Sequence, residues 1–379
     1  MDSFSPATFT DTKKHYPILD GLRGVAAVMV VMFHILETFS LGDHNKQIIN
    51  HGYLAVDFFF VLSGFVIGYA YDDRWPKMGL KEFFKRRLIR LQPMIIAGMV
   101  IGAITFYFQD CSIFPGISQT PVWKMLLVML IGFTLFPVGR SLDVRGWYEM
   151  HPLNGPAWTL FYEYIANILY ALFIRKFSNK VLSILAIIAG AALIHLALTN
   201  GQGDLIGGWS LEPKQLWIGF TRLTYPFTAG LLLSRVIKPG HINKAFLWCS
   251  ILLIISLSIP RIGGHEDLWM NGLYDALIVI IVFPIIVYLG ASGTVLGPAV
   301  KINKFLGEIS YPMYIIHYPF IYLFMAWVTN NNINAASPED IPTLIMVSIF
   351  LLIGIILLAY AMVRLYDIPV RKWLMKRLM

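Results

Sequence analysis

The stretch ILDGLRGVAAVMVVMFHILETF, residues 18–39, decides the fold. Its length corresponds to about 33 Å of helix, which is enough to cross the hydrocarbon core of a bilayer. The stretch carries Asp20, Arg23 and His34 in a run that is otherwise almost wholly apolar. Ionisable side chains in a span face a protein interior or an aqueous cavity. Arg23 and His34 are about three helical turns apart, so the spacing predicts that both point to one side, roughly 16 Å apart along the axis.

The composition places the chain among polytopic membrane proteins. Its 379 residues are 57% hydrophobic and only 14% charged, whereas a soluble domain carries about 25% charged residues. We attribute the net charge of +8 to Lys and Arg near membrane ends, so nucleic-acid binding does not follow from it. The two cysteines indicate no disulfide framework, and the histidines show no metal-binding spacing.

Eleven hydrophobic segments are candidates for membrane spans. They lie near residues 18–39, 52–71, 93–109, 122–138, 158–175, 181–198, 215–236, 245–260, 272–290, 309–328 and 342–364. If all of them cross, Lys and Arg divide equally between the two sides; if 122–138 enters and leaves by one face, they divide twenty-three to seven. Cytoplasmic loops carry the excess of Lys and Arg, so we favour the second arrangement. The same rule leaves 93–109 open as the segment that does not cross.

We therefore predict an all-α, polytopic integral membrane helical bundle. It has about ten transmembrane helices and a re-entrant or half-spanning segment at 122–138. Cytoplasmic tails at residues 1–15 and 375–379 flank a membrane domain over 16–374. The polar N-terminal stretch lacks the order of a signal peptide, so we expect the first span to be retained.

The most basic stretch is DDRWPKMGLKEFFKRRLIRLQP, residues 72–93. Its apolar residues are spaced as in an interfacial amphipathic helix. Basic residues beside a span can simply hold it on the cytoplasmic side against anionic lipid. They can also form a cradle for a phosphorylated cytosolic ligand, with Arg86, Arg87 and Arg90 on the phosphates. The two interpretations are compatible, and both remain open at this point.

Other polar residues lie inside predicted spans, where each requires a partner. Asp57 and Glu163 are placed at a depth similar to that of His34, so we expect all three to meet in one cavity. Arg222 requires an acid or a phosphate as its partner. His317 is either a packed core residue or a substrate-binding one.

The aromatic residues that lead into the span at 158–175, Trp158 and Tyr162 among them, have two interpretations. Interface anchoring explains them about as well as contact with a ligand does. We nevertheless place Trp158 and Tyr162, together with His317 and Arg222, among the substrate-binding candidates.

These motifs together resemble the membrane acyltransferase-3 family. The resemblance rests on LDGLRGVAAVMVVMFH, GYLAVDFFFVLSGFVI, FFKRRLIRLQP, WTLFYEYIANILY, ISYPMYIIHYPF and the terminal YDIPVRKWL, in this order along nearly the whole chain. Members acylate sugars and other hydroxyl-bearing acceptors, commonly on bacterial surface glycans or lipid-linked precursors.

The resemblance assigns roles to particular residues. It implies that Arg23 and His34 are the family's essential pair in the first helix. Arg86, Arg87 and Arg90 match its basic motif, and Trp158 and Glu163 match its tryptophan and acid. Some members carry a fused extracytoplasmic hydrolase-like domain, which we do not expect here because the chain ends soon after its last span.

We expect transfer of an acyl group, by family frequency acetyl, from a cytosolic acyl-CoA to a carbohydrate or glycolipid hydroxyl. His34 acts as general base or as a covalent acyl relay, with Glu163 or Asp57 orienting its ring, because the reference pKa of histidine, about 6.5, suits proton transfer. Arg23 and the basic cluster bind the donor phosphates. No metal and no permanently bound cofactor is expected.

Two other function classes compete with the enzyme, and the oligomeric state cannot be read from the sequence. A secondary transporter of a small or lipid-linked substrate also has intramembrane charges and broken helices, although we find no convincing internal repeat. A membrane-bound scaffold would tolerate loss of His34. By the family resemblance, the membrane is the bacterial cytoplasmic (inner) membrane.

Overall fold

The computed structural model describes residues 15–40, 42–43, 46–238, 240–263, 265–295 and 297–379, and its regular elements are helices. The α-helices are α1 (Pro17–Phe39), α2 (Ala55–Tyr71), α3 (Leu80–Thr105), α4 (Val122–Gly132), α5 (Ala157–Leu172), α6 (Asn179–Thr199), α7 (Pro213–Val236), α8 (Ala245–Ser258), α9 (Leu268–Leu277), α10 (Phe283–Ala291), α11 (Ala299–Asn330), α12 (Ile341–Met362) and α13 (Ile368–Leu378). The described residues contain no β-strand, only an isolated bridge between Ile242 and Gly293. The all-α prediction is confirmed.

Short turns of other helix types connect these elements. Single 3-10 turns are η1 (Gly52–Leu54), η2 (Phe106–Gln109), η3 (Arg140–Leu142), η4 (Ile174–Lys176) and η5 (His265–Asp267), and two π-helical turns are η6 (Ile278–Val282) and η7 (Val363–Asp367). Each π turn joins two α-helices without a break, so α9 continues into α10 and α12 continues into α13.

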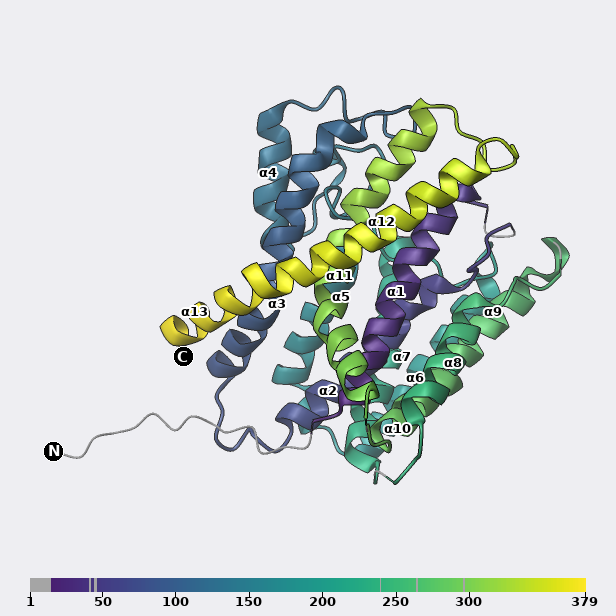
Figure 1. Cartoon of the computed structure of the whole chain (residues 1–379). Coiled ribbons are helices and arrows are strands. Elements are labelled where there is room, and N and C mark those ends of the chain that lie inside the picture. The colour runs from purple at the N-terminus through teal and green to yellow at the C-terminus, as the bar shows by residue number, and fades with distance from the viewer. Residues whose placement is uncertain (1–14, 41, 44–45, 239, 264, 296) are drawn as a thin grey trace.

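Two helix pairs form the centre of the bundle. Helix α1 packs along α11, and α2 packs along α7 (Figure 1). A Cβ atom on Gly64 would lie 2.0 Å from the Phe227 carbonyl oxygen, and one on Gly230 would lie 2.0 Å from the Val61 carbonyl oxygen. Glycine at both positions therefore lets the backbones of α2 and α7 touch, which small residues permit between membrane helices.

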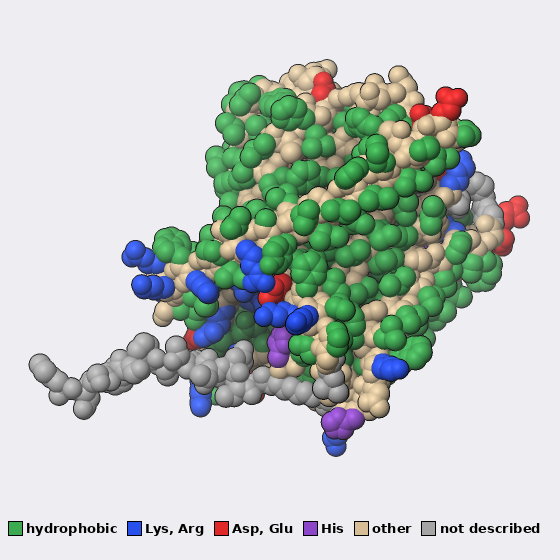
Figure 2. Space-filling model, in the orientation of Figure 1, with side chains coloured by type: hydrophobic (Ala, Val, Ile, Leu, Met, Phe, Trp, Pro, Cys, Tyr) green, Lys and Arg blue, Asp and Glu red, His purple; other side chains and the backbone are tan. Residues whose placement is uncertain are grey.

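Six helical stretches are long and apolar enough to cross a membrane: Pro17–Phe39, Gly52–Tyr71, Leu80–Gln109, Asn179–Thr199, Leu268–Ala291 and Ile341–Leu378. The face seen in Figure 2 is largely hydrophobic, and its Lys and Arg side chains gather around α13. The chain is therefore a multi-pass helical membrane protein. The finer count of about ten crossings remains a prediction.

The short helix α4 agrees in length with a half-spanning segment. It has eleven residues, or about 16 Å, which is roughly half the thickness of the hydrocarbon core. The turn that follows contains Leu135 in the left-handed region at φ 57°.

One predicted boundary is wrong. We expected an interfacial helix over the basic stretch and a separate span at 93–109, whereas α3 runs without a break from Leu80 to Thr105 through Pro93. The buried residues Phe83, Arg87, Leu91 and Met94 recur at helical spacing on both sides of the proline. Tertiary packing of this continuous face outweighs the cost of proline within a helix.

The predicted tails fall differently at the two ends. Residues 1–14 lie outside the described part of the chain. At the other end, α13 extends to Leu378, so residues 375–378 are helical; that residues 375–379 form a cytoplasmic tail stays a prediction.

The contact between α2 and α7 yields a stability prediction. We expect Gly64→Ala to reduce the yield and melting temperature of the detergent-purified protein strongly, because its methyl group would overlap the Phe227 carbonyl. Thermal unfolding followed by intrinsic fluorescence measures this. Gly354→Ala on α12 is the matched control, since a Cβ there meets nothing within 4 Å and Ala favours helix by about 1 kcal/mol over Gly. Equal stability of the two variants would contradict the prediction.

Candidate active site

Three cavities lie in series beside α1. The first, here the basic cavity, has a volume of about 690 Å³. Its lining includes Arg23, Arg86 and Lys372. The second, the central cavity, has about 160 Å³. The third, the aromatic cavity, has about 460 Å³ and contains His34.

Shared walls establish the order of these cavities. The basic and central cavities share Arg23, Val66, Arg87, Arg90 and Arg371. The central and aromatic cavities share only Val56 and Tyr314 among their lining residues. The first junction is therefore lined mainly by cations. The second, here the constriction, is where Val56 and Tyr314 stand between the central and aromatic cavities.

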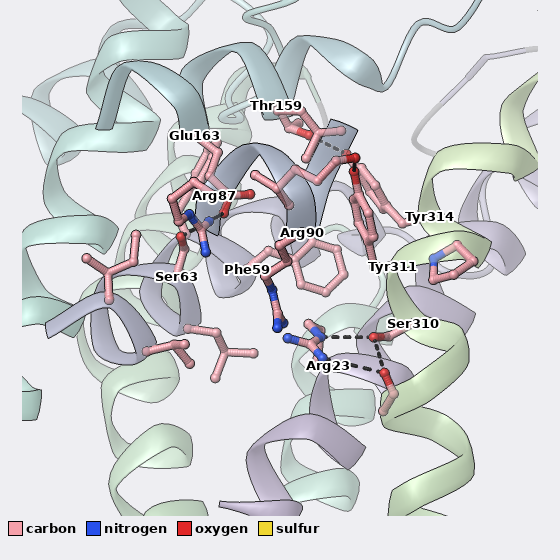
Figure 3. A pocket seen from close by; sticks show the side chains of 18 of the residues that line it. Arg23, Phe59, Ser63, Arg87, Arg90, Thr159, Glu163, Ser310, Tyr311 and Tyr314 are labelled. Atoms are coloured by element: carbon pink, nitrogen blue, oxygen red, sulfur yellow. Dashed lines mark hydrogen bonds and ion pairs between the residues drawn. The ribbon is translucent and has the colours of Figure 1, made fainter. Parts of the chain in front are cut away.

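At the cationic junction, the guanidinium groups of Arg23 and Arg90 point toward each other from α1 and α3 (Figure 3). Arg23 is anchored by Asp20 at 3.1 Å, and its Nε donates to Ser310 Oγ at 2.9 Å. The Arg90 side chain, which lines both cavities, has no hydrogen bond or ion pair among the described residues. Two facing cations repel each other unless an anion lies between them, so this geometry suits a phosphate.

The central cavity contains a hydrogen-bonded ion pair. Arg87 Nη2 donates to Glu163 Oε1 at 2.7 Å, and Ser63 Oγ donates to the same oxygen at 3.1 Å (Figure 3). Residues of α2, α3 and α5 are thus tied together beside the path from the basic cavity. Arg87 Nε is buried without a hydrogen-bond partner among the described residues.

The constriction is fixed by hydrogen bonds. The Tyr314 hydroxyl lies 2.9 Å from Thr159 Oγ1, and Thr159 Oγ1 donates to the Pro156 carbonyl at 2.9 Å. The Tyr314 carbonyl accepts from His317 Nδ1 at 2.7 Å. The ring of Tyr314 therefore has a defined position between the central and aromatic cavities.

In the aromatic cavity, His34 has an orienting carboxylate. Its Nδ1 lies 3.0 Å from Glu37 Oε2, one turn further along α1. The ring stacks on His317 with centroids 5.5 Å apart and meets the edge of Tyr318 at 4.7 Å. A carboxylate on Nδ1 leaves Nε2 as the basic nitrogen, which is the arrangement that a general base requires.

A second carboxylate, Glu149, lines the same cavity from the loop before α5. Tyr322 donates its hydroxyl hydrogen to this carboxylate, at 2.8 and 2.7 Å from the two oxygens. Arg145 Nε is 3.8 Å away, and its guanidinium carbon lies 3.5 Å from the centroid of the Tyr322 ring. Burial raises the pKa of Glu149 to about 7, and Arg145 only partly offsets this effect.

Arg222, which lines the aromatic cavity, belongs to a buried ion pair. Arg222 donates to the two oxygens of Asp57 at 2.6 and 3.2 Å and to the Tyr53 carbonyl at 2.9 Å. Both charged side chains are almost fully buried. Breaking such a pair costs about 3–5 kcal/mol because one buried charge is left alone. Asp57 and Arg222 thus hold α2 and α7 together at the cavity wall, where Trp158 covers the guanidinium at 5.5 Å.

The structure separates residues that we expected to meet. Asp57 pairs with Arg222 and Glu163 pairs with Arg87, so neither carboxylate touches His34. We expected the three residues to meet because the predicted spans place them at a similar depth in the membrane. The side chains of Asp57 and Glu163 instead point toward Arg222 and Arg87.

The remaining candidates fall into three groups. Arg86, Arg87 and Arg90 line the basic cavity, whereas Trp158 and Arg222 line the aromatic cavity. Tyr162 and His317 line none of the three cavities. Tyr162 packs against Gly219 and Phe220 of α7. The His317 ring stacks on the ring of His34.

Sequence reasoning missed several residues of the site. Glu37 could have been found, because residues three positions apart on a helix are neighbours. Glu149 was visible as an acid in an aromatic stretch, but nothing local indicated that it faces His34. Tyr314, Tyr318 and Arg371 lie within the quoted motifs ISYPMYIIHYPF and YDIPVRKWL, but nothing local indicated that their side chains line the cavities. Among the described residues, no group of three or more His, Cys, Asp or Glu could hold a metal ion.

Comparisons with known proteins identify the family of the chain. Residues 16–364 match a family described as "Acyltransferase domain". "O-acetyltransferase OatA" of Staphylococcus aureus is 24% identical over 334 residues, 81% of this chain and 51% of that protein. "Peptidoglycan O-acetyltransferase OatA" of Listeria monocytogenes is 23% identical over 336 residues, 82% of this chain and 50% of that protein. "Protein 2 in picA locus" of Rhizobium radiobacter is 30% identical over 169 residues, 42% of this chain and 82% of that protein.

The chain therefore spans about half the length of the OatA relatives that it matches. No solved structure gives a significant match to it.

The pKa of Glu149 predicts a pH-dependent stability. The folded protein holds this proton more tightly than the unfolded chain does, whose ordinary value is 4.5. The resulting stabilisation is complete below that value and is lost as the pH rises through about 7. Glutamine is neutral throughout, so we expect the melting temperature of Glu149→Gln to rise relative to wild type between about pH 5 and pH 8.

Thermal unfolding of both proteins in detergent, across that range, measures the difference. The exposed Glu339→Gln is the control and should show no such trend. A constant offset between Glu149→Gln and wild type at every pH would contradict the assignment.

Proposed function

The chain belongs to the acyltransferase domain family over residues 16–364, and from this membership we propose that it is a membrane O-acyltransferase. The donor is a cytosolic acyl-CoA, with acetyl as the first group to test. The acceptor is a hydroxyl group of a carbohydrate or glycolipid. The names of the OatA relatives support O-acetylation.

The observation that carries this proposal is the series of cavities from Arg23 to His34. The basic cavity provides arginine side chains for the phosphates of CoA. The rise of α1 separates the two residues by about 16 Å, a distance that a pantetheine arm can span. A donor bound by its nucleotide at the cationic junction would thus bring its thioester to the aromatic cavity.

The chemistry follows from the contacts of His34. Its Nε2 takes the proton of the acceptor hydroxyl while Glu37 stabilises the imidazolium that forms. The acceptor oxygen attacks the thioester carbonyl carbon, the carbon–sulfur bond breaks, and the proton passes from His34 to the departing thiolate. In a covalent relay, the acyl group would reside on Nε2 between the two steps, and the same contacts would serve it.

The lining of the aromatic cavity favours a sugar as the acceptor. Its aromatic residues are Phe33, Tyr53, Trp147, Trp158, Trp209, Tyr314 and Tyr318. Aromatic faces stack on the apolar faces of a sugar ring, and the carboxylates Glu37 and Glu149 can accept hydrogen bonds from its hydroxyls. The proposal places the basic cavity and both termini on the cytoplasmic side of a bacterial inner membrane.

A secondary transporter is the alternative, since cavities in series also suit a carrier. Purified protein in detergent distinguishes the two. With acetyl-CoA and an oligosaccharide acceptor, the enzyme releases free CoA thiol and forms an acetylated product, whereas a carrier releases no thiol. Mass spectrometry of surface glycans from cells with and without the gene then identifies the acceptor.

Substitution of His34 tests the catalytic assignment. We expect His34→Gln to lower kcat by about 10²–10⁴-fold, the usual contribution of a general base, while acetyl-CoA still binds. Thiol release and product formation measure this in detergent. His195→Gln is the matched control, because His195 is exposed on α6. Full activity of His34→Gln would overturn the assignment.

Substitution of Tyr314 tests the constriction. We expect Tyr314→Ala to raise acceptor-independent release of CoA thiol, because water would then reach the thioester from the aromatic cavity. Tyr314→Phe keeps the ring and should hydrolyse acetyl-CoA at the wild-type rate when no acceptor is present. If Tyr314→Ala, folded and active, shows no increase in this hydrolysis, Tyr314 does not separate the two cavities.

A further inference from the structure

The C-terminal helix α13 forms a wall of the basic cavity. Ile368, Arg371, Lys372 and Met375 of this helix line it, together with Met379. This helix lies beyond residues 16–364, where the chain matches its family. The stretch YDIPVRKWL, residues 366–374, is among the motifs that resemble the family, but that resemblance assigned no role to Arg371 or Lys372.

We propose that α13 is part of the donor site, with Arg371 binding the pyrophosphate and Lys372 the ribose phosphate of acyl-CoA. This inference rests on the proposed function, since it concerns the same donor. It makes the C-terminal helix a determinant of donor affinity and of selectivity for a phosphorylated nucleotide.

The position of Arg371 supports the first assignment. Arg371 lines both the basic and the central cavity, as Arg23 and Arg90 do. The pyrophosphate of CoA is the anionic group next to the pantetheine arm, so it belongs at this junction. Arg371 Nη1 donates to Asp367 Oδ2 at 2.9 Å. Asp367 is the last residue of the π turn η7, so this turn orients the guanidinium group. A π turn within a helix often marks a functional site.

The position of Lys372 supports the second assignment. Lys372 lines the basic cavity but not the central one, so it lies farther from His34. The ribose phosphate is likewise the end of CoA farthest from the thioester. The lining includes Arg23, Arg74, Arg86, Arg87, Arg90, Arg371 and Lys372 but a single acid, Asp20. This excess of positive charge suits a ligand with several phosphates.

Helix α13 is held in place at its far end. Lys85 Nζ of α3 donates to the Leu378 carbonyl at 2.5 Å. Helices α3 and α13 pack against each other, and Figure 2 shows that Lys and Arg gather around α13. The two cationic walls of the cavity, α3 and α13, are therefore in contact with each other.

The decisive experiment compares acetyl-CoA with acetyl-dephospho-CoA, which lacks the ribose phosphate, in a lipid-free neutral detergent. We expect Arg371→Ala to raise KM for both donors by about tenfold, as loss of a charge-assisted contact does. Lys372→Ala should raise KM for acetyl-CoA alone and so remove the preference over the dephospho donor. Changes in kcat should stay within about twofold, and Arg371→Lys should recover part of the affinity.

The matched control is Lys376→Ala with Arg377→Ala. These residues are basic and exposed on the same helix but do not line the cavity. Unchanged KM values in folded Arg371→Ala and Lys372→Ala would overturn the inference, as would an equal loss in the control. An effect seen only with added phosphatidylglycerol vesicles would also overturn it and assign the cations to lipid phosphate. If wild type itself releases no thiol from acetyl-CoA, the proposed function fails instead.

Discussion

Two guanidinium groups that face each other inside a membrane bundle set the main constraint on this structure. Arg23 and Arg90 converge from α1 and α3 where the basic and central cavities join. Water or an anion must reach them, because paired like charges in an apolar medium are very costly. Packing of α1 against α11 fixes one of them through Ser310. The cavity that relieves this repulsion is the same one that can bind phosphates.

The path from that junction to His34 alternates between polar and aromatic walls. Arg87 and Glu163 border the central cavity. Val56 and Tyr314 stand between that cavity and the aromatic cavity. Under the proposed function, this arrangement would place a charged nucleotide and a neutral sugar in different compartments. The two would meet only through the flexible arm of the donor, which limits loss of the activated acyl group to water.

Much of this could be predicted from the sequence, because it depends on local periodicity. The shared face of Arg23 and His34, the apolar helices and the basic cluster all follow from helix geometry. The pairing of Asp57 with Arg222 could not, since it joins residues 165 positions apart. The uninterrupted α3 was missed because Pro93 is a local signal that tertiary packing outweighs. Glu37, which orients the His34 ring, could have been predicted, because residues three positions apart on a helix are neighbours.

The most direct test of the account is an experimental structure with a non-hydrolysable acyl-CoA analogue. The account predicts that the pyrophosphate lies between Arg23 and Arg90, and that the pantetheine arm passes Tyr314. The acyl carbonyl carbon would then lie close to where the sugar hydroxyl binds, and that hydroxyl would lie within hydrogen-bonding reach of His34 Nε2. Nucleotide density elsewhere, or an arm that turns away from the central cavity, would contradict it.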